Sequence, residues 1–345
     1  MANYTLANLV KAQIKLASSF ANNDKRFVSP DVFKLFIGQR AEQFFPSYKE
    51  LKTSDSRAVE ANYFKRTAQA LITTGRSHNH TGTGGDSGVL PLAWVTNSTT
   101  FSITLKQADK SIYSWQELFN NDIENKVIDF ANGLNTTAGT YLFDNRTGVN
   151  TASVKGTFDG TNDVYVIESA FKEESITITK VVAELLKYKG VILDLVCDSY
   201  SYTEFLRQAA QGAQNATNTS FQFMGTTFVH DPNLTARAVA LDVTYTGGFW
   251  LAVPQGYVAC PDWIPVENRQ GVETKENTYG TLMNPVDGLQ YAVHSYETRA
   301  DGTGVNGEKQ DVLTQVELSI DLSFNHAPSS VVDETPIMAF AVATV

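Results

Sequence analysis

A long helical pattern in the first half of the chain most constrains the fold. Its apolar residues recur at helical spacing in this order: Trp115, Phe119, Ile123, Val127, Ala131 and Leu134. Ser114 and Glu117 match a capping box, in which each side chain satisfies the other's free backbone N–H. We expect the helix to reach about Phe143, despite Gly133 and Gly139, which gives a rod of roughly 40 Å. Such a rod is the centre of a bundle or a spine across a flat molecule, and the strands predicted around it favour the spine.

A long hairpin is predicted over residues 64–107. Leu90, Leu92 and Trp94 alternate with other residues before the clear return strand around Phe101 and Ile103, and Pro91 indicates an edge or a bend. The outgoing arm, 64–74, is also compatible with a helix near 67–71. The tip, 77–88, is polar and rich in glycine, so it has no means of packing a core.

The N-terminal part is predicted to be an amphipathic helix followed by an extended arm. Leu6, Leu9, Val10, Ile14 and Phe20 recur near helical spacing over residues 5–21. Residues 27–52 are rich in Phe and interrupted by Pro30, Gly38 and Pro46. We expect this arm to need another surface on which to lie.

The second half of the chain alternates helices and strands before strands dominate. A helix over 175–188 with Val181, Val182, Leu185 and Leu186 on its buried face, and Gly190 as its C-cap, precedes a strand at 191–196. A capping box of Ser201 and Glu204 predicts a short helix over 202–213. This order predicts an α/β layer. The remaining strands are expected at 221–229, 249–253, 257–259, 290–296, 314–324 and 337–342, with a glycine-rich turn at 301–307.

Composition excludes several classes of protein. The net charge of −10 gives no basic face for gripping nucleic acid. Charged residues are 19% of the chain, below the usual quarter or so, which favours a surface hidden against other copies of the chain. No stretch approaches the ~18 apolar residues of a membrane span, and without a signal-like start we expect folding in the cytoplasm. Cys197 and Cys260, each among apolar residues, are predicted to be reduced core thiols.

Several local patterns resemble catalytic or ligand sites without completing them. Gly85-Asp86-Ser87-Gly88 is similar to a serine-protease nucleophile segment, but His78 and His80 are too close in sequence to come from a separate barrel. His78, His80 and Asp86 could ligate a metal, but a third strong ligand and a rigid frame are missing. The glycine-rich segments 82–88 and 301–307 match neither a phosphate loop nor a calcium loop. We therefore predict no catalytic residue, no cofactor and no metal.

Several segments together resemble the major capsid proteins of tailed bacteriophages, which share the Hong Kong 97-type fold. Residues 76–82 with 85–87 look like the tip of that family's extended loop, and 105–109 with 114–118 look like the start of its spine helix. The passage 209–223 is similar to a helix-to-strand passage of the axial domain. Asp262-Trp263-Ile264-Pro265 and Asn268-Arg269 also resemble family segments. In combination, their order and spacing are specific.

The resemblance implies an α+β fold with five parts. These are an N-terminal arm at 1–63, an extended β-hairpin loop at 64–110, the spine helix and peripheral domain at 111–174, an axial domain at 175–265, and return strands of the peripheral domain at 266–345. The arm and the loop would cross onto neighbouring subunits. The residues expected at those contacts are Phe33, Phe36, Phe44, Phe45, Ser77, His78, Asn79, His80, Asp86 and Trp94.

The resemblance further implies a structural protein and not an enzyme. The chain would assemble through pentamers and hexamers into an icosahedral virion shell that encloses double-stranded DNA without reading its sequence. Portal, scaffolding or decoration proteins would be its partners, with scaffolding as a separate protein and no lysine–asparagine crosslink. The alternatives are another virion protein, such as a minor capsid or tail tube protein, and a strand-rich hydrolase or glycan-binding module. Its scattered tryptophans, Trp94, Trp115, Trp250 and Trp263, favour core packing over a glycan platform.

Overall fold

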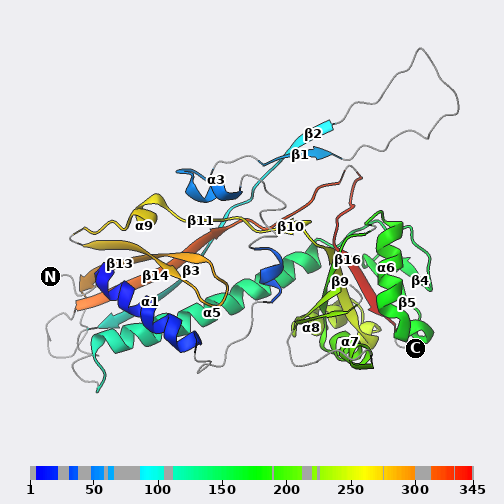
Figure 1. Ribbon diagram of the computed structural model, residues 1–345, viewed down its shortest axis with the longest axis horizontal. Coiled ribbons are helices and arrows are strands. Elements are labelled where there is room, and N and C mark those ends of the chain that lie inside the picture. Colours follow the sequence, from blue (N-terminus) through cyan, green and yellow to red (C-terminus); the bar gives the residue numbers. More distant parts are fainter. Residues whose placement is uncertain are drawn as a thin grey trace, which may run out of the picture.

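The chain folds into an elongated α+β molecule with a long helix along much of its length (Figure 1). The computed structural model describes residues 5–21, 31–37, 48–57, 61–65, 86–104, 112–188, 190–211, 220–223, 226–274, 276–299, 312–329 and 331–343. The long helix, α5 (Trp115–Asp144), has 30 residues and begins at the predicted capping box of Ser114 and Glu117. Its predicted apolar stripe faces the core: Phe119, Ile123, Val127, Ala131 and Leu134 are all buried.

A five-stranded antiparallel sheet lies beside the first part of α5. The strand β14 (Val312–Leu322) pairs with β3 (Val95–Thr104) on one side and with β13 (Gln290–Arg299) on the other. The strands β12 (Asn277–Met283) and β11 (Asp262–Trp263) pair with β13 and β14 respectively. Alternate residues such as Phe101, Val316 and Val293 pack toward α5 and α1 (Leu6–Ala21), so the helices cover one face.

A seven-stranded mixed sheet forms the other end of the molecule (Figure 1). Its strands, in spatial order, are β4 (Gly156–Asp159), β5 (Val164–Ile167), β16 (Met338–Val342), β9 (Phe249–Pro254), β6 (Leu193–Cys197), β8 (Thr226–His230) and β7 (Ser220–Phe223). The β5–β16 and β6–β8 pairs are parallel, and the others are antiparallel.

Helices cover both faces of this second sheet. Trp250 faces α6 (Ser175–Leu185) and α7 (Ser199–Gln211), where its ring meets Phe205 at a centroid distance of 5.3 Å. Phe249 faces the opposite way, toward α8 (Leu234–Leu241) and the end of α5, and meets Phe143 at 5.8 Å. Every residue of β6 and β9 is buried, as expected for strands enclosed on both faces.

The remaining elements are short. A two-stranded ribbon of β1 (Ala61–Lys65) and β2 (Asp86–Leu90) lies apart from both sheets (Figure 1). The strands β10 (Val258–Ala259) and β15 (Asn325–His326) form a second small pair. The short helices are η1 (Phe33–Leu35), α3 (Tyr48–Thr53), η2 (Ser169–Glu174), η3 (Tyr245–Gly247) and α9 (Val266–Gln270).

The predicted hairpin is only partly correct. Its return strand, β3, pairs with β14 from the far end of the chain, while β1 and β2 pair with each other. Most of the predicted outgoing arm and tip, 66–85, lies outside the described residues. The predicted bend at Pro91 falls in the break between β2 and β3. Local alternation identified β3 as a strand, but a partner more than 200 residues away leaves no local signal.

The buried faces of two helices differ from the prediction. In α1, Val10 and Ile14 are 58% and 66% exposed, while Ala12 and Leu16 pack inward. In α6, Val181 and Leu185 are exposed and Ile178 takes their place in the core. Both helices rest on a single surface, so the buried stripe is narrower than the apolar one.

The helix ends and the sheet membership also differ. The C-cap of α6 is Leu186, followed by a left-handed Lys187, and not Gly190. Helix α7 begins at Ser199, where Asp198 accepts a hydrogen bond from the Ser201 N–H at 2.7 Å, so Ser201 is not the N-cap. The strand predicted at 221–229 is divided into β7 and β8. Strands β4, β5 and β16, assigned by sequence to the peripheral parts 111–174 and 266–345, join the seven-stranded sheet instead.

Candidate assembly surfaces

The predicted contact residues come from the tip of the hairpin and from the N-terminal arm. Ser77, His78, Asn79, His80, Phe44 and Phe45 lie outside the described residues. Asp86 begins β2, opposite Lys65 of β1. The ribbon has five residues in each strand, and an isolated ribbon of this kind is only marginally stable in water. It therefore needs a further surface to support it.

Two of the predicted contacts are core residues of the chain itself. Phe33 and Phe36 have no exposed surface. Phe36 packs edge-on against Phe324 at a centroid distance of 5.2 Å and against Tyr141 at 5.9 Å. The prediction that Phe33 and Phe36 contact a neighbouring subunit is wrong, because α5 and the chain after β14 already enclose this part of the arm.

Trp94 keeps a position suited to a contact. It lies half-buried between β2 and β3, and its indole N–H is enclosed without a hydrogen-bond partner among the described residues. A buried indole N–H normally finds an acceptor, so this unsatisfied donor is an exception within the described part of the chain.

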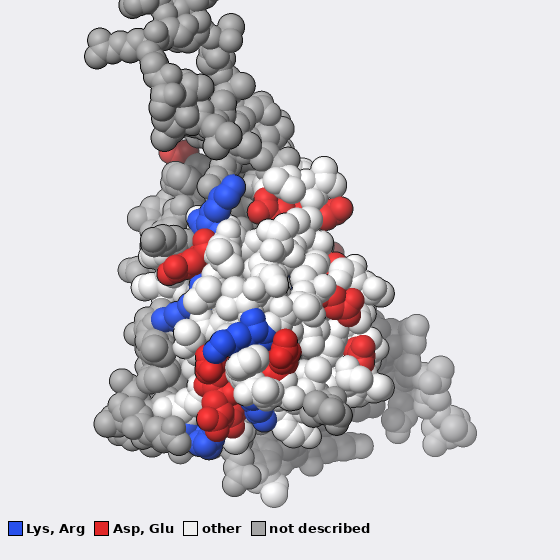
Figure 2. Space-filling model, turned by 90° about the vertical axis from the view of Figure 1, so that its right-hand side faces the viewer, with Lys and Arg blue, Asp and Glu red and all other residues white. Residues whose placement is uncertain are grey.

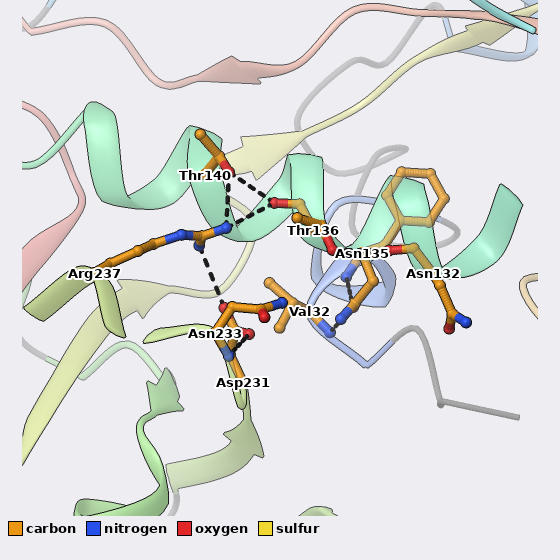
Figure 3. A network of polar contacts seen from close by, with 9 residues as sticks. Val32, Asn132, Asn135, Thr136, Thr140, Asp231, Asn233 and Arg237 are labelled. Atoms are coloured by element: carbon orange, nitrogen blue, oxygen red, sulfur yellow. Dashed lines mark hydrogen bonds and ion pairs between the residues drawn. The ribbon is translucent and has the colours of Figure 1, made fainter. Parts of the chain in front are cut away.

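A polar network joins α8, which packs on the seven-stranded sheet, to α5 (Figure 3). Arg237 of α8 donates to the carbonyl oxygen of Thr136 at 3.2 Å and to the Thr140 hydroxyl at 2.8 Å. Its guanidinium also lies 3.5 Å from the carboxylate of Asp231, which is 1% exposed. A Cβ atom at Gly139 would lie 2.6 Å from that carboxylate, so the close approach of α8 to α5 depends on glycine at this position. This network fixes how the seven-stranded sheet sits on the long helix.

One turn earlier, α5 holds the N-terminal segment. The side-chain oxygen of Asn135 accepts hydrogen bonds from the backbone N–H groups of Val32 at 3.0 Å and Phe33 at 3.2 Å (Figure 3). Asn135 is buried, and the two N–H groups that it satisfies belong to the start of η1. Residues 31–37 are thereby fixed to the same stretch of helix as the seven-stranded sheet.

A strap formed by residues 48–57 is fixed across β11 and β14. Arg269 donates to the carbonyl oxygens of Lys52 and Ser54, at 2.9 and 2.7 Å, and the Trp263 indole N–H also donates to Ser54. Lys52 and Arg57 make ion pairs with the buried Asp262 and Asp321, at 3.0 and 3.2 Å. Because buried carboxylates require partners, the strap is part of the folded subunit and not a loose arm.

The outer end of the seven-stranded sheet carries both signs of charge. Figure 2 shows acidic and basic groups side by side there, with uncharged surface between them. Among them, Arg207 lies 2.6 Å from Glu204 and 3.5 Å from Glu173, and Lys155 pairs with Glu174. These are exposed pairs of small energetic weight, so this end is a mixed surface and not a basic anion-binding one.

The potentially reactive groups among the described residues include two thiols and a serine–histidine pair. Burial raises the pKa values of the Cys197 and Cys260 thiols well above normal, which makes both poor nucleophiles, and both are free, as predicted. The Ser199 hydroxyl lies 3.1 Å from Nε2 of His230, and Tyr202 stacks on that imidazole. Within the described ranges, no group of three or more His, Cys, Asp or Glu residues could hold a metal, and no helix is long and apolar enough to cross a membrane.

Sequence reasoning did not identify the junction around Arg237. Asp231-Pro232-Asn233 is a typical helix start and could have predicted α8. The pairing of Arg237 with α5, about 100 residues earlier, has no sequence signal in a single chain.

No protein-family model and no curated protein matches this chain. Solved structures do resemble it over most of its length. One, described as Mycobacterium phage Che8, has a TM-score of 0.47 and 9% identity, and the alignment covers 88% of this chain and 90% of that one. The Cyanophage Pam1 capsid asymmetric unit has a TM-score of 0.43 and 9% identity, with coverages of 83% and 85%. The mature capsid of bacteriophage PhiM1 gives 0.43 and 11%, with coverages of 83% and 82%.

Proposed function

We propose that this chain is the major capsid subunit of a tailed bacteriophage and that it has the Hong Kong 97-type fold. The observation that carries the proposal is the architecture: a capped 30-residue helix runs along an elongated molecule, with a sheet beside it, a second sheet at its end and a separate ribbon. Phage capsids recur among the structures that resemble the chain, but with TM-scores below 0.5 the proposal depends on the architecture and on the sequence resemblance.

The architecture leaves surfaces that a monomer does not need. The ribbon β1–β2 has no third strand among the described residues, and the five-stranded sheet has long helices on one face and, among those residues, the strap 48–57 with its short helix α3 on the other. An extended subunit of this kind gains stability when neighbouring copies cover such surfaces. Many weak contacts of this sort add by multivalency, and heterologous contacts between identical subunits close into rings.

The charge of the chain agrees with enclosing a genome and not gripping it. The net charge is −10, and the described surface at the end of the seven-stranded sheet mixes both signs. A wall without a basic face does not immobilise DNA, because phosphate binding depends on clustered Lys and Arg. In this proposal the subunits assemble in the host cytoplasm into pentamers and hexamers of an icosahedral shell, with portal, scaffolding or decoration proteins as partners.

The proposed parts of the subunit follow the fold. Helix α5 is the spine, the five-stranded sheet belongs to the peripheral domain and the seven-stranded sheet to the axial domain. The segment 77–88 is the proposed tip of the extended loop, and Ser77, His78, Asn79, His80 and Asp86 remain proposed contact residues there. Phe44, Phe45 and Trp94 are retained as proposed contacts, whereas Phe33 and Phe36 are not.

The test is negative-stain electron microscopy of the purified chain, expressed alone and with its neighbouring phage genes. Closed shells, rings of five or six, or curved sheets are expected. Tubes of uniform width would favour a tail tube protein instead. A dispersed monomer in both preparations at every salt concentration would contradict the proposal and favour a hydrolase or binding module.

A further inference from the structure

The five-stranded sheet carries a hollow of about 420 Å³ on the face that points away from α5. Three neighbouring strands, β3, β13 and β14, contribute its polar and aromatic side chains: Thr100, Ser102, His294, Tyr296, Gln315 and Glu317. The strand register sets these side chains in two rows. Glu317 lies between Thr100 and His294, and Gln315 lies between Ser102 and Tyr296. Direct cross-strand neighbours are about 5 Å apart, so both rows can contact one small molecule, and the hollow is large enough to hold it.

The charge of this hollow is negative near neutral pH. Glu317 supplies its one carboxylate, and the described lining holds no lysine or arginine. Burial lowers the pKa of His294, although the Glu317 carboxylate acts in the opposite direction, so the imidazole is predominantly neutral at pH 7. The charge therefore favours a cation and disfavours a phosphate, sulfate or carboxylate ligand.

Hydrogen-bond acceptors predominate among the groups that line the hollow. Nε2 of His294 lies 3.1 Å from the side-chain oxygen of Asn277, which can only accept, so Nε2 carries the proton and Nδ1 is an acceptor. The Tyr296 hydroxyl donates to the side-chain oxygen of Gln315, and the tyrosine oxygen can still accept. The two hydroxyl groups of β3 and the carboxylate of β14 are further acceptors, whereas the Gln315 amide nitrogen can only donate. This set fits a ligand that has several donors and no acceptor.

The aromatic rings at one side of the hollow favour a planar cation. His294 and Tyr296 stack on each other with their centroids 5.8 Å apart, and Tyr296 is 38% exposed. A guanidinium group is planar, carries five N–H donors and no acceptor, and stacks on aromatic rings. An ammonium group has only three donors and no plane with which to stack.

We propose that this hollow binds a small organic cation with a guanidinium group, which donates hydrogen bonds to Glu317 and packs against Tyr296. The inference goes beyond the proposed function and does not depend on it. Charge complementarity with the single carboxylate and the excess of acceptors identify the class of ligand.

Two ligands of the same shape test whether the charge is required. N-Butylguanidinium and N-butylurea share the alkyl chain and a planar polar end, but only the first is a cation. Saturation-transfer NMR of each ligand, titrated into the full-length chain, gives the two dissociation constants. We expect N-butylguanidinium to bind, and N-butylurea to bind about tenfold more weakly or not at all, because the urea cannot form a charge-assisted hydrogen bond.

Substitutions in the hollow test its place in the fold. Glu317→Gln is expected to raise the dissociation constant of N-butylguanidinium about tenfold, because the amide carries no charge. Thr100→Lys places an ammonium group opposite Glu317 and should abolish binding. Glu168→Gln is the matched control, since Glu168 is exposed and precedes η2, far from β14 in the fold, and it should bind normally. Unfolding midpoints of all three variants confirm that they fold.

Three results would overturn the guanidinium site: no binding of N-butylguanidinium, equal affinity for N-butylurea, or an unchanged dissociation constant in Glu317→Gln. Binding of an arginine-containing peptide without binding of N-butylguanidinium would also overturn it, because the ligand would then be a protein segment and not a small cation. None of these results bears on the proposed function, which depends on assembly seen by microscopy. A chain that never assembles but binds N-butylguanidinium through Glu317 would contradict the proposed function and support the site.

Discussion

In the seven-stranded sheet, helices cover both faces and the central strands are buried along their whole length, whereas the five-stranded sheet is covered by α1 and α5 on one face and, among the described residues, more sparsely on the other. The burial of β14 accordingly alternates along most of its length, while that of β9 does not. The seven-stranded sheet is enclosed by its own chain. The five-stranded sheet is a slab. Among the described residues, its other face carries the strap 48–57 and a row of partly exposed rings, Tyr279, His294 and Tyr296.

On the proposed function, this difference predicts which half of the molecule would depend on contacts with other copies. The seven-stranded sheet gains its stability within the subunit, and only its outer helices are left for neighbours. The ribbon and the less covered face of the five-stranded sheet have less internal support among the described residues. We therefore expect substitutions in the seven-stranded sheet to unfold the subunit. Substitutions around the five-stranded sheet should have smaller effects on the stability of the dispersed chain.

The largest effect is expected from Trp250→Ala. Trp250 stacks on Phe340 and donates its indole N–H to the buried Thr179 hydroxyl at 3.0 Å. Truncation leaves a large cavity in the doubly covered sheet, and we expect a loss of about 4 kcal/mol in the free energy of unfolding. Denaturant unfolding of the dispersed subunit measures it. Trp94→Ala, at a half-buried tryptophan outside that core, is the control and should cost clearly less; equal losses would remove the distinction between the two regions.

The junction between the two sheets should be the next most sensitive place. Arg237→Met leaves the buried Asp231 carboxylate without its cation, and we expect a loss of about 3 kcal/mol. Chemical denaturation again gives the value. Thr140→Val removes one hydrogen-bond partner of Arg237 but leaves the ion pair, so it should cost only about 1 kcal/mol. If Arg237→Met left the free energy of unfolding unchanged, packing alone would join α8 to α5.

The sequence predicted the elements whose signals are local. The capping box at Ser114, the four-residue steps of α5 and the alternation of β3 each depend on neighbours within a few turns, and all were found in the structure. The α+β class and the two free core cysteines were also predicted correctly.

The errors fall where distant partners decide the structure. The alternation of β3 cannot reveal that its partner is β14, and the phenylalanines of the arm cannot reveal that Phe324 and Tyr141 already enclose them. Strands β4 and β5 have only four residues each, too few for a periodic signal.

A pH effect is expected at the turn between β12 and β13. Burial raises the pKa of Asp287 to about 6, from 3.8, although Tyr291 and the Leu289 N–H donate hydrogen bonds to its carboxylate. The folded chain therefore holds this proton more tightly than the unfolded chain. The resulting stabilisation, about 3 kcal/mol, is fully present below about pH 4 and is lost as the pH rises through about 6.

Asp287→Asn tests this effect, because an amide does not titrate and still accepts a hydrogen bond from Tyr291. Unfolding midpoints are compared between about pH 4 and about pH 7, and the variant should lose part of the decline that the unsubstituted chain shows. Asp129→Asn is the control, since Asp129 is exposed on α5 and should leave the decline in place. If both variants keep the same slope, Asp287 does not contribute to it.

The smallest effect should come from the start of the long helix. In Ser114→Ala, the N–H of Glu117 loses the serine oxygen at 3.3 Å, and the Glu117 carboxylate keeps only the backbone N–H of residue 114, at 2.8 Å. We expect a loss of about 1 kcal/mol by thermal or chemical unfolding. Ser114→Thr is the conservative control and should retain most of the stability. This end of α5 lies beside the five-stranded sheet and far from the junction, so a loss as large as that of Arg237→Met would mean that the half-covered region sets the stability of the whole subunit.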